Sequence, residues 1–398
     1  MRAQVGIEES EYVTRLNNLK TQMVDKGIDA ALLSVGADVY YFSGTAAYSI
    51  LLISLSSYPV LFVRIGFDIA CRDSWLPGQN IRRFHGMKDL TSTLLDVAPG
   101  AKVIGMEKDV MSAALWDKTT QQLPNYRFED ISPLVLAVRM VKSMSEVELI
   151  KKASGISHQG FLRCREILRE GCTEMEVQCE IERSQRALGA AESMVMRLLS
   201  GGGFGVVASG PNTYQMCGPA VAISGVGTIS SHPYGASARH IQKGDLVVVD
   251  KGTAFHGYHA DEARTFTVGK ASADQQRFFD IDREIQDAAI EAIKPGVLVS
   301  DVYAAAKKVA IKHDCLDYFM GYAQFGVEYV GHGVGLEIDE PPLITPYDNS
   351  VLTPGMVLAV EPKLVVPGWG GIQIEDTVVV TGFGHEILTS STRELVEV

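Results

Sequence analysis

Residues 245–268, which read DLVVVDKGTAFHGYHADEARTFTV, place two aspartates beside strongly apolar runs. Asp250 ends the run LVVVD, and Asp261 follows the turn-like HGYH and comes shortly before the apolar TFTV. Both runs are typical of strands. We therefore expect both carboxylates at or near a hydrophobic interior, where an ionised group without a partner costs several kcal/mol or takes up a proton instead.

Three ionisable residues later in the chain belong to the same set. Glu361 in LAVEPKLVV and Glu375 in GIQIEDTVVV are embedded in strand-forming runs, and His332 stands between glycines in GHGVGLEIDEPP. Four carboxylates in such runs need a shared compensating charge. Two divalent cations would supply it.

Each of these residues also has an ordinary explanation when it is taken alone. Asp250 fits a turn at the end of a strand, and Asp261 could pair with Arg264. Glu361 and Glu375 could face outward from half-exposed strands, as most charged strand residues do. A single histidine is more often a surface or hydrogen-bonded residue than a ligand. The combination of the five residues and their spacing favours the metal site.

The rest of the chain predicts two parts. Helical and strand patterns alternate up to about residue 143, with a helix from residue 9 to Gly27 and strands at 28–33, 59–64 and 102–106, which indicates an α/β unit. The second part has helices at 145–168, 173–190, 272–294 and 299–314 and strands at 245–252, 356–366 and 371–381. Helices followed by strands of antiparallel type favour an α+β fold.

The motifs DKGTAFHGYHADEARTF, GHGVGLEIDEPP, LAVEPKLVV and GIQIEDTVVVT resemble, in this order, those of the pita-bread metallohydrolases. This family includes methionine aminopeptidase, aminopeptidase P, prolidase and their creatinase-like relatives. Asp250 and Asp261 are 11 residues apart, as in the family pattern. EYVTRLNNLKTQMVDKGIDAALL, VKSMSEVELIKKA and ASGPN resemble the N-terminal domain, linker helix and substrate-side loop of the prolidase and aminopeptidase P branch, so the resemblance covers essentially the whole chain.

The resemblance implies an α+β protein, with a smaller creatinase-type α/β domain at residues 1–138 and a pita-bread catalytic domain at residues 139–398. It implies that two divalent cations bind to Asp250, Asp261, His332, Glu361 and Glu375. Asp261 and Glu375 would bridge both ions, Asp250 would bind one, and His332 and Glu361 would complete the other. Mn²⁺ or Co²⁺ is expected first, and Zn²⁺ or Fe²⁺ also suits such ligands.

The chemistry implied is hydrolysis. Two cations a few ångströms apart lower the pKa of a bridging water, so that hydroxide forms at neutral pH and attacks a carbonyl. Glu361 would also act as the catalytic proton shuttle toward the leaving amine. His232 matches a family histidine that hydrogen-bonds near the scissile bond, although here about twenty residues separate it from the SGPN at 209–212. His256 and His259 lie near Asp261, and we expect at least one of them on a surface turn.

Two positions depart from the peptidases of the family. Those enzymes usually read GHG[IV]GLxxHE, and Asp339 replaces the second histidine, so an acceptor stands where a donor is usual. Losing one oxyanion donor typically costs about 10²–10³-fold in rate. Gln373 replaces the arginine that commonly precedes IED. Asp339, Gln373 and His259 are therefore candidate substrate-binding residues, and peptide specificity is less firmly implied than metal binding.

The leading interpretation is a peptidase that hydrolyses Xaa-Pro bonds, as a dipeptidase or an aminopeptidase, because the chain has the N-terminal domain that methionine aminopeptidases lack. Two alternatives stay open: the same fold acting on a small molecule as a C–N hydrolase or lyase, and a binding relative without catalysis. The resemblance also implies a homodimer.

Composition sets the remaining bounds. A chain of 398 residues with 46% hydrophobic residues can bury a large core, and its net charge of −12 argues against nucleic acid or an anionic membrane as the main partner. The longest apolar run, at 48–63, is interrupted by Ser56, Ser57 and Pro59 and predicts two strands joined by a turn. Six cysteines without a CxxC pair, and an N-terminus without a signal-peptide pattern, predict a cytoplasmic protein with reduced thiols.

Overall fold

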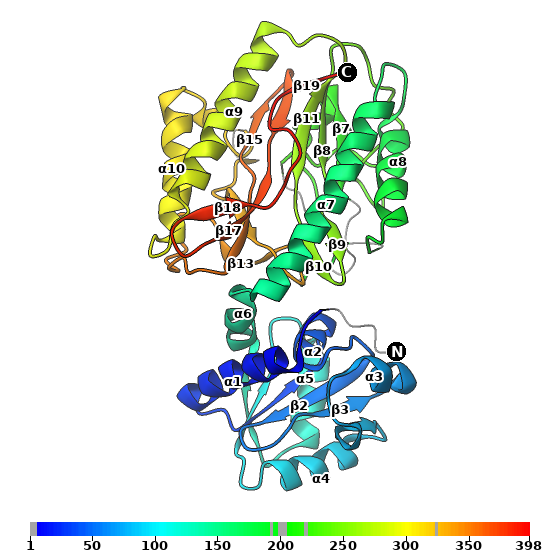
Figure 1. The fold of residues 1–398 in the computed structure, drawn as a ribbon, viewed down its shortest axis with the longest axis vertical. Helices are drawn as coiled ribbons and strands as arrows, with labels where there is room; N and C mark the ends of the chain where they lie inside the picture. The colour runs from blue at the N-terminus through cyan, green and yellow to red at the C-terminus, as the bar shows by residue number, and fades with distance from the viewer. Residues whose placement is uncertain (1–5, 192–193, 198–204, 219–221, 323–324) are drawn as a thin grey trace. The chain divides into compact units, whose positions relative to one another are not determined.

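The computed structural model describes residues 6–191, 194–197, 205–218, 222–322 and 325–398. The chain divides into two compact units, residues 1–139 and residues 140–398 (Figure 1). Each unit has its own sheets and helices. The ionisable residues singled out from the sequence all belong to the second unit.

The first unit is built on one mixed sheet with strand order β4-β3-β2-β1-β5-β6. Its strands are β1 (Ala30–Leu33), β2 (Ser49–Ser54), β3 (Val60–Val63), β4 (Ile81–Arg83), β5 (Val103–Met106) and β6 (Arg127–Asp130). Its helices are α1 (Glu9–Lys26), α2 (Gly36–Ser43), α3 (Phe67–Asp73), α4 (Met87–Val97), α5 (Ala113–Gln122) and α6 (Ser132–Met140). The helix expected from residue 9, the strand after it and the two strands within 48–63 are confirmed.

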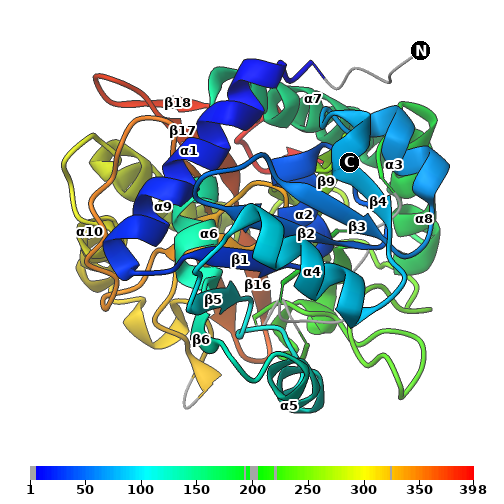
Figure 2. The ribbon, with the colours of Figure 1, turned by 90° about the horizontal axis from the view of Figure 1, so that it is seen from below.

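The sheet of the first unit is covered on both faces because its apolar side chains alternate in direction. Leu32, Leu52 and Phe62 pack with Leu90 and Leu94 of α4. Figures 1 and 2 show α1 on the opposite face. The central strand β1 is buried along its whole length, as a strand between two layers of helices should be.

The second unit contains two larger sheets and two strand pairs. A four-stranded sheet has the order β19-β11-β8-β7, a five-stranded sheet has the order β13-β12-β14-β17-β18, and β9 pairs with β10 and β15 with β16. The strands are β7 (Val206–Ser209), β8 (Leu246–Asp250), β9 (Thr253–Phe255), β10 (Tyr258–Ala260), β11 (Ala263–Thr267), β12 (Gly331–Gly333), β13 (Glu340–Leu343), β14 (Val357–Val360), β15 (Lys363–Val366), β16 (Gly370–Gln373), β17 (Asp376–Val380), β18 (His385–Ile387) and β19 (Val396–Glu397).

Two helix pairs cover these sheets from opposite sides (Figure 1). Helices α7 (Met144–Ile167) and α8 (Glu174–Ala187) pack on the four-stranded sheet, where Phe161 and Ile181 meet Val247 and Val249. Helices α9 (Ala273–Ala292) and α10 (Val299–Lys312) pack on the five-stranded sheet. Val248, which points to the other face of β8, packs into an inner cluster between the layers.

The strands expected at 356–366 and 371–381 are each two shorter strands, which corrects the prediction of continuous strands. β14 pairs with β12 and β17 in the five-stranded sheet, whereas β15 pairs only with β16 among the described strands. The breaks fall at Glu361–Pro362 and at Ile374–Glu375. Pro362 has no N–H to donate to a ladder, which explains one of the two breaks.

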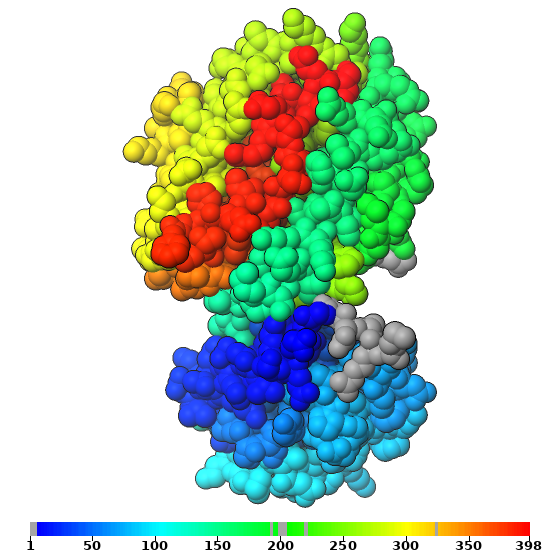
Figure 3. All heavy atoms as spheres, viewed as in Figure 1, coloured from blue at the N-terminus to red at the C-terminus, as the bar shows by residue number. Residues whose placement is uncertain are grey.

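The C-terminal segment lies on the surface of the second unit between α7 and α9, where it is drawn in red (Figure 3). Its end is held by β19, which pairs with β11, and by the N–H of Val398, which donates to Thr267 O. All six cysteines are free thiols. Within the described part of the chain, no helix is both long and apolar enough to cross a membrane.

Candidate metal centre

Four of the five residues expected as metal ligands come from the ends or the interruptions of strands, and the fifth, His332, lies within a short strand. Asp250 ends β8, Asp261 lies between β10 and β11, His332 lies in β12, Glu361 lies between β14 and β15, and Glu375 lies between β16 and β17. Strand pairing then brings these segments together: Ala263 of β11 is paired with Asp250 on one side and bridged to Glu375 on the other. His332 is paired with Ala359, two residues before Glu361.

The ligand atoms form two groups that share one member. Asp261, His332 and Glu375 each present one ligand atom within 4.8 Å of the others, and so do Asp250, Glu361 and Glu375. The Nε2 of His332 lies 3.5 Å from Glu361 Oε1 and 3.8 Å from Asp261 Oδ2. Residues that are up to 125 positions apart in the sequence therefore meet in one cluster.

Burial and mutual repulsion shift the pKa values of these carboxyl groups. Burial and the neighbouring Asp250 raise the pKa of Asp261 to about 8. Burial, Asp261 and Glu361 raise the pKa of Glu375 well above its usual range. Oε2 of Glu375 is buried without a hydrogen-bond partner among the described residues. Buried carboxylates that face one another in this way are the donor set of a divalent cation, so the residues present fit a metal ion.

The imidazole of His332 is oriented for the same role. Its Nδ1 lies 3.0 Å from Gly333 O. A proton on Nδ1, donated to this carbonyl, leaves the Nε2 lone pair directed at Asp261 and Glu361. Burial lowers the pKa of His332, but the carboxylates of Asp339 and Glu361 raise it by more, so the net shift is upward.

Buried polar groups behind the cluster fix the backbone of the ligand segments. Arg264 is 2% exposed and donates to Ala263 O at 2.8 Å and to Glu375 O at 2.5 Å. Gln286 of α9 donates to Val360 O at 3.0 Å and to Ile374 O at 3.2 Å. These two carbonyls belong to the residues immediately before Glu361 and Glu375. The same helix residue therefore holds both interrupted strands.

The sequence allowed an ion pair between Asp261 and Arg264, but Arg264 has other partners in the structure. Arg264 pairs instead with Asp376 at 2.7 Å and with Glu262 at 3.1 Å. Asp261 is anchored through its backbone, which exchanges hydrogen bonds with the hydroxyl of Thr377. Its carboxylate lies 3.8 Å from His332 Nε2 and lines a cavity.

Lys363 is a functional candidate that the sequence analysis missed. Its Nζ lies 2.9 Å from Glu361 Oε2 and 3.9 Å from Asp250 Oδ2, and its side chain is 4% exposed. Across the strand pair it stands opposite Gln373, whose Nε2 donates to Asp250 Oδ2 at 2.9 Å. The signal was present in the sequence, because on the single strand predicted for 356–366 Lys363 and Glu361 are two residues apart and would share a face.

A cavity of about 740 Å³ opens above the cluster within the second unit. Asp250, Asp261, His332, Glu361 and Lys363 all line it. Much of the rest of the wall is apolar and includes Met175, Met194, Met196, Ile229, Met320 and Ile338. Methionine side chains adapt to ligands of different shape, so this wall can accept more than one apolar group.

The substrate-site candidates separate into residues on the cavity wall and residues behind it. His232 and Asp339 line the cavity, and the ring of His232 lies against Tyr234 with centroids 4.0 Å apart. His259 is not among the described residues that line it. Nε2 of His259 accepts from Val195 N at 3.1 Å, and Nδ1 lies 3.0 Å from Gly335 O, so the ring bridges two loops.

Two further positions complete the site. Gln373 lies behind the cluster, where it orients Asp250. Tyr329 lines the cavity and stacks on His332 with ring centroids 6.1 Å apart, and burial raises the pKa of its phenol well above the usual range. The sequence analysis missed Tyr329.

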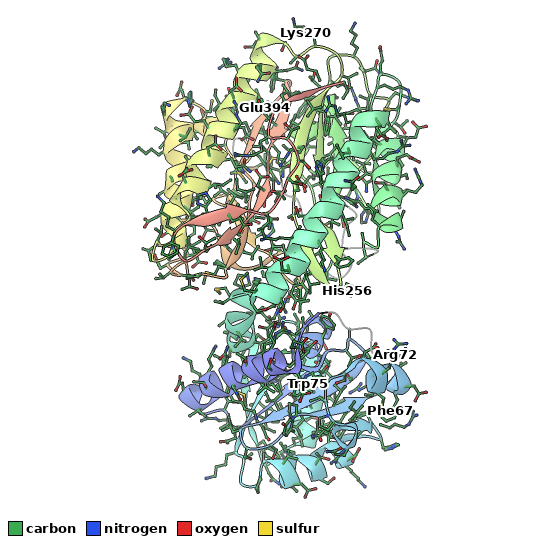
Figure 4. The ribbon with its side chains drawn as sticks, in the orientation of Figure 1. Phe67, Arg72, Trp75, His256, Lys270 and Glu394 are labelled. Carbon is green, nitrogen blue, oxygen red and sulfur yellow. The ribbon has the colours of Figure 1, made fainter. Side chains whose placement is uncertain are left out.

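His256 lies at the turn between β9 and β10 (Figure 4), and its side chain is exposed.

The fold and the site define a metallopeptidase. Residues 148–382 match metallopeptidase family M24, and residues 15–141 match the creatinase/prolidase N-terminal domain. The chain therefore belongs to metallopeptidase family M24. This confirms the expected pita-bread fold with its creatinase-type N-terminal domain, the metallohydrolase class and the use of divalent metal ions.

Relatives of nearly the same length are known. The chain is 29% identical over 384 residues to a protein of Pyrococcus furiosus named Xaa-Pro dipeptidase, with 96% of this chain and 99% of the relative covered. Its fold is similar to that of the prolidase from Pyrococcus horikoshii OT3, with a TM-score of 0.81, 28% identity and coverage of 96% and 100%. It is also similar to the X-Pro aminopeptidase from Thermotoga maritima MSB8, with a TM-score of 0.80, 28% identity and coverage of 96% and 99%.

Proposed function

We propose that this chain is a metal-dependent peptidase that hydrolyses Xaa-Pro bonds in short peptides, as a dipeptidase or an aminopeptidase. The observation that carries the proposal is the cluster of four carboxylates and one imidazole, of which Asp250, Asp261, His332 and Glu361 line a cavity. The full-length relatives named Xaa-Pro dipeptidase and X-Pro aminopeptidase support the choice of substrate. We propose that divalent metal ions, Mn²⁺ or Co²⁺ first, bind at these five residues.

Divalent ions, when bound, lower the pKa of a coordinated water and polarise the scissile carbonyl. The chain's own residues would do the remaining work. Glu361 would accept the proton of the attacking water and pass it to the leaving amine, because its carboxylate borders both the cluster and the cavity. His232, on the cavity wall, would donate a hydrogen bond near the scissile bond.

The polar wall next to His332 would set the orientation of the substrate. Asp339 lines the cavity, and its charge acts on His332 and on Tyr329. A carboxylate accepts hydrogen bonds, so Asp339 would bind an N–H or ammonium group of the substrate. Gln373 would act through Asp250, to which it donates at 2.9 Å. The methionine-rich wall would receive apolar side chains.

The test is release of free proline from Xaa-Pro dipeptides, and of the N-terminal residue from Xaa-Pro-Xaa tripeptides, after reconstitution with Mn²⁺ or Co²⁺. Asp261→Ala is the negative control, and Lys270→Ala, an exposed substitution outside the site, is the matched positive control. Preference for one peptide length separates a dipeptidase from an aminopeptidase. Turnover no higher than that of Asp261→Ala on every peptide would contradict the proposal.

A second candidate is hydrolysis or lysis of a C–N bond in a small molecule. Asp339 on the cavity wall and Lys363 beside Glu361 favour it, because each places a charge inside the site that a peptide backbone does not require. A panel of acylamino and amidino compounds, assayed beside the peptides, separates the two candidates.

The proposal also includes assembly and location. We propose a homodimer, by resemblance to the family, and a cytoplasmic enzyme, because free thiols suit a reducing compartment. Light scattering of the purified protein measures the first, and fractionation of cells measures the second.

A further inference from the structure

The metal centre has two halves, the Asp250–Glu361–Glu375 group and the Asp261–His332–Glu375 group, and a lysine pairs with the carboxylates of the first half. Lys363 places its Nζ 2.9 Å from Glu361 Oε2 and 3.9 Å from Asp250 Oδ2. These carboxylates are two of the three members of the Asp250–Glu361–Glu375 group. An ammonium group thus stands where these carboxylates would otherwise require a metal ion.

The position of Lys363 is fixed by the strands around it. Lys363 begins β15 and is paired with Gln373 of β16, and its carbonyl accepts from Met320 N at 2.8 Å. The backbone therefore has partners on both sides of the strand. The side chain is 4% exposed, so its charge lies within the protein and not in solvent.

In the other half of the centre, formed by Asp261, His332 and Glu375, no lysine or arginine of the described residues forms an ion pair with either carboxylate. Asp261 and Glu375 meet the Nε2 of His332, and Oε2 of Glu375 has no hydrogen-bond partner among the described residues. Imidazole and carboxylate oxygens together form an ordinary site for a divalent transition-metal ion. This half therefore still requires an ion.

We propose that Lys363 is a built-in cation that replaces one of the two ions, so that the centre binds one divalent ion tightly at Asp261, His332 and Glu375 and a second only by displacing the ammonium group. The inference rests on the proposed metal site and concerns its stoichiometry. One divalent ion and the ammonium group supply three positive charges against four carboxylates. A second divalent ion at Asp250 and Glu361 would lie beside the ammonium group, which is 3.9 Å and 2.9 Å from these carboxylates, and two cations so close together in a buried site repel each other strongly.

The experiment measures metal stoichiometry and not activity. Metal-free full-length protein is titrated with Mn²⁺ by calorimetry, and the product is examined by electron paramagnetic resonance. Isolated Mn²⁺ gives a six-line signal, whereas two ions in one site are exchange-coupled and lose it. Lys363→Met removes the charge while it keeps most of the side-chain volume. Lys251→Met is the matched control, because Lys251 is also buried but pairs with Glu182 at 3.3 Å.

We expect one tight equivalent and an uncoupled signal for the wild type and for Lys251→Met, with any second site at least about 100-fold weaker. Lys363→Met should bind two equivalents and give a coupled signal. Two tight equivalents in the wild type would overturn the inference even if Lys363→Met failed to fold. One equivalent in Lys363→Met would overturn it as well. One equivalent in a wild type that cleaves no peptide would leave the inference standing and refute the proposed substrate.

Discussion

Arg264→Met tests whether a buried ion-pair network holds the two ligand segments in place. In the folded protein, Arg264 pairs with Asp376 at 2.7 Å and Glu262 at 3.1 Å and donates to the carbonyl of Glu375. Methionine fills much of the same space without donating. Asp376 keeps a second ion-pair partner, Arg393, at 2.9 Å. Glu262 is therefore the carboxylate whose negative charge loses most of its compensation.

The magnitude follows from the state of Glu262 after the substitution. Glu262 is fully buried, and burial already raises its pKa although Arg264 lowers it. Without the arginine, the cheapest response is protonation. Protonating a carboxyl group of ordinary pKa 4.5 at pH 7 costs about 3 kcal/mol. Removing one partner of a buried pair typically costs about 3–5 kcal/mol, so we expect this loss in the free energy of unfolding of the second unit.

The assay is urea unfolding followed by the fluorescence of Trp369, the tryptophan of the second unit, in a background where Trp75 and Trp116 are replaced by phenylalanine. The loss should shrink by about 2 kcal/mol between pH 7 and pH 5. The sign follows from linkage: a raised folded-state pKa contributes stability that is present below the unfolded pKa and is lost as the pH rises.

Glu262→Gln should restore at least about 1 kcal/mol when it is combined with Arg264→Met, because an amide carries no charge to bury. A loss below about 1 kcal/mol in the single variant, or a loss of equal size at pH 5 and pH 7, would refute the reasoning.

Three further predictions concern the site and the core. Metal affinity should rise between pH 6 and pH 8, because the metal displaces the proton that Asp261, with its pKa of about 8, holds in the metal-free protein. Calorimetry at several pH values measures the affinity, and an affinity that does not change with pH would contradict the prediction. Asp282→Asn should stabilise the protein by about 1–3 kcal/mol at pH 7 but not at pH 4. Burial raises the pKa of Asp282 well above its usual range, and a raised pKa costs stability only as the pH rises. Equal unfolding midpoints of the variant and the wild type at pH 7 would refute this prediction. Gly160→Ala should cost about 1–3 kcal/mol in denaturant unfolding, because the new Cβ would lie 2.5 Å from Gln185 Nε2; an unchanged midpoint would show that this side chain moves away freely.

Local sequence was sufficient for part of the regular structure, including the first helix and the two strands within 48–63, and for the choice of candidate ligands. The helix ending at Gly27 was predictable because glycine adopts the left-handed conformation there, with φ of 66°. Asp250, Asp261 and Glu375 were recognisable because each stands beside an apolar run of strand type and because their order and spacing match a family pattern.

The interruptions of the strands were not predictable from the same runs. Apolar residues of strand type lie on both sides of Glu361 and of Glu375, so the local pattern predicts one strand for each run although Pro362 stands at the first break. The chain changes sheets at Glu361 and Glu375 because the partners of each half are different strands. Those partners come from distant parts of the sequence, which a local pattern does not contain.

By itself, the sequence determined which residue types are available for metal chemistry and the apolar, strand-forming runs beside them. Only the tertiary structure decided which charges share the site. On the continuous strand that the sequence predicts for 356–366, Lys363 and Glu361 point the same way, but the sequence does not show whether that face meets solvent or a cavity. The pairing of β15 with β16 and the packing beside Met320 bury Lys363 among the carboxylates. The same long-range packing places Asp339 on the cavity wall and His259 behind it, because a cavity is enclosed by segments that are far apart in the chain.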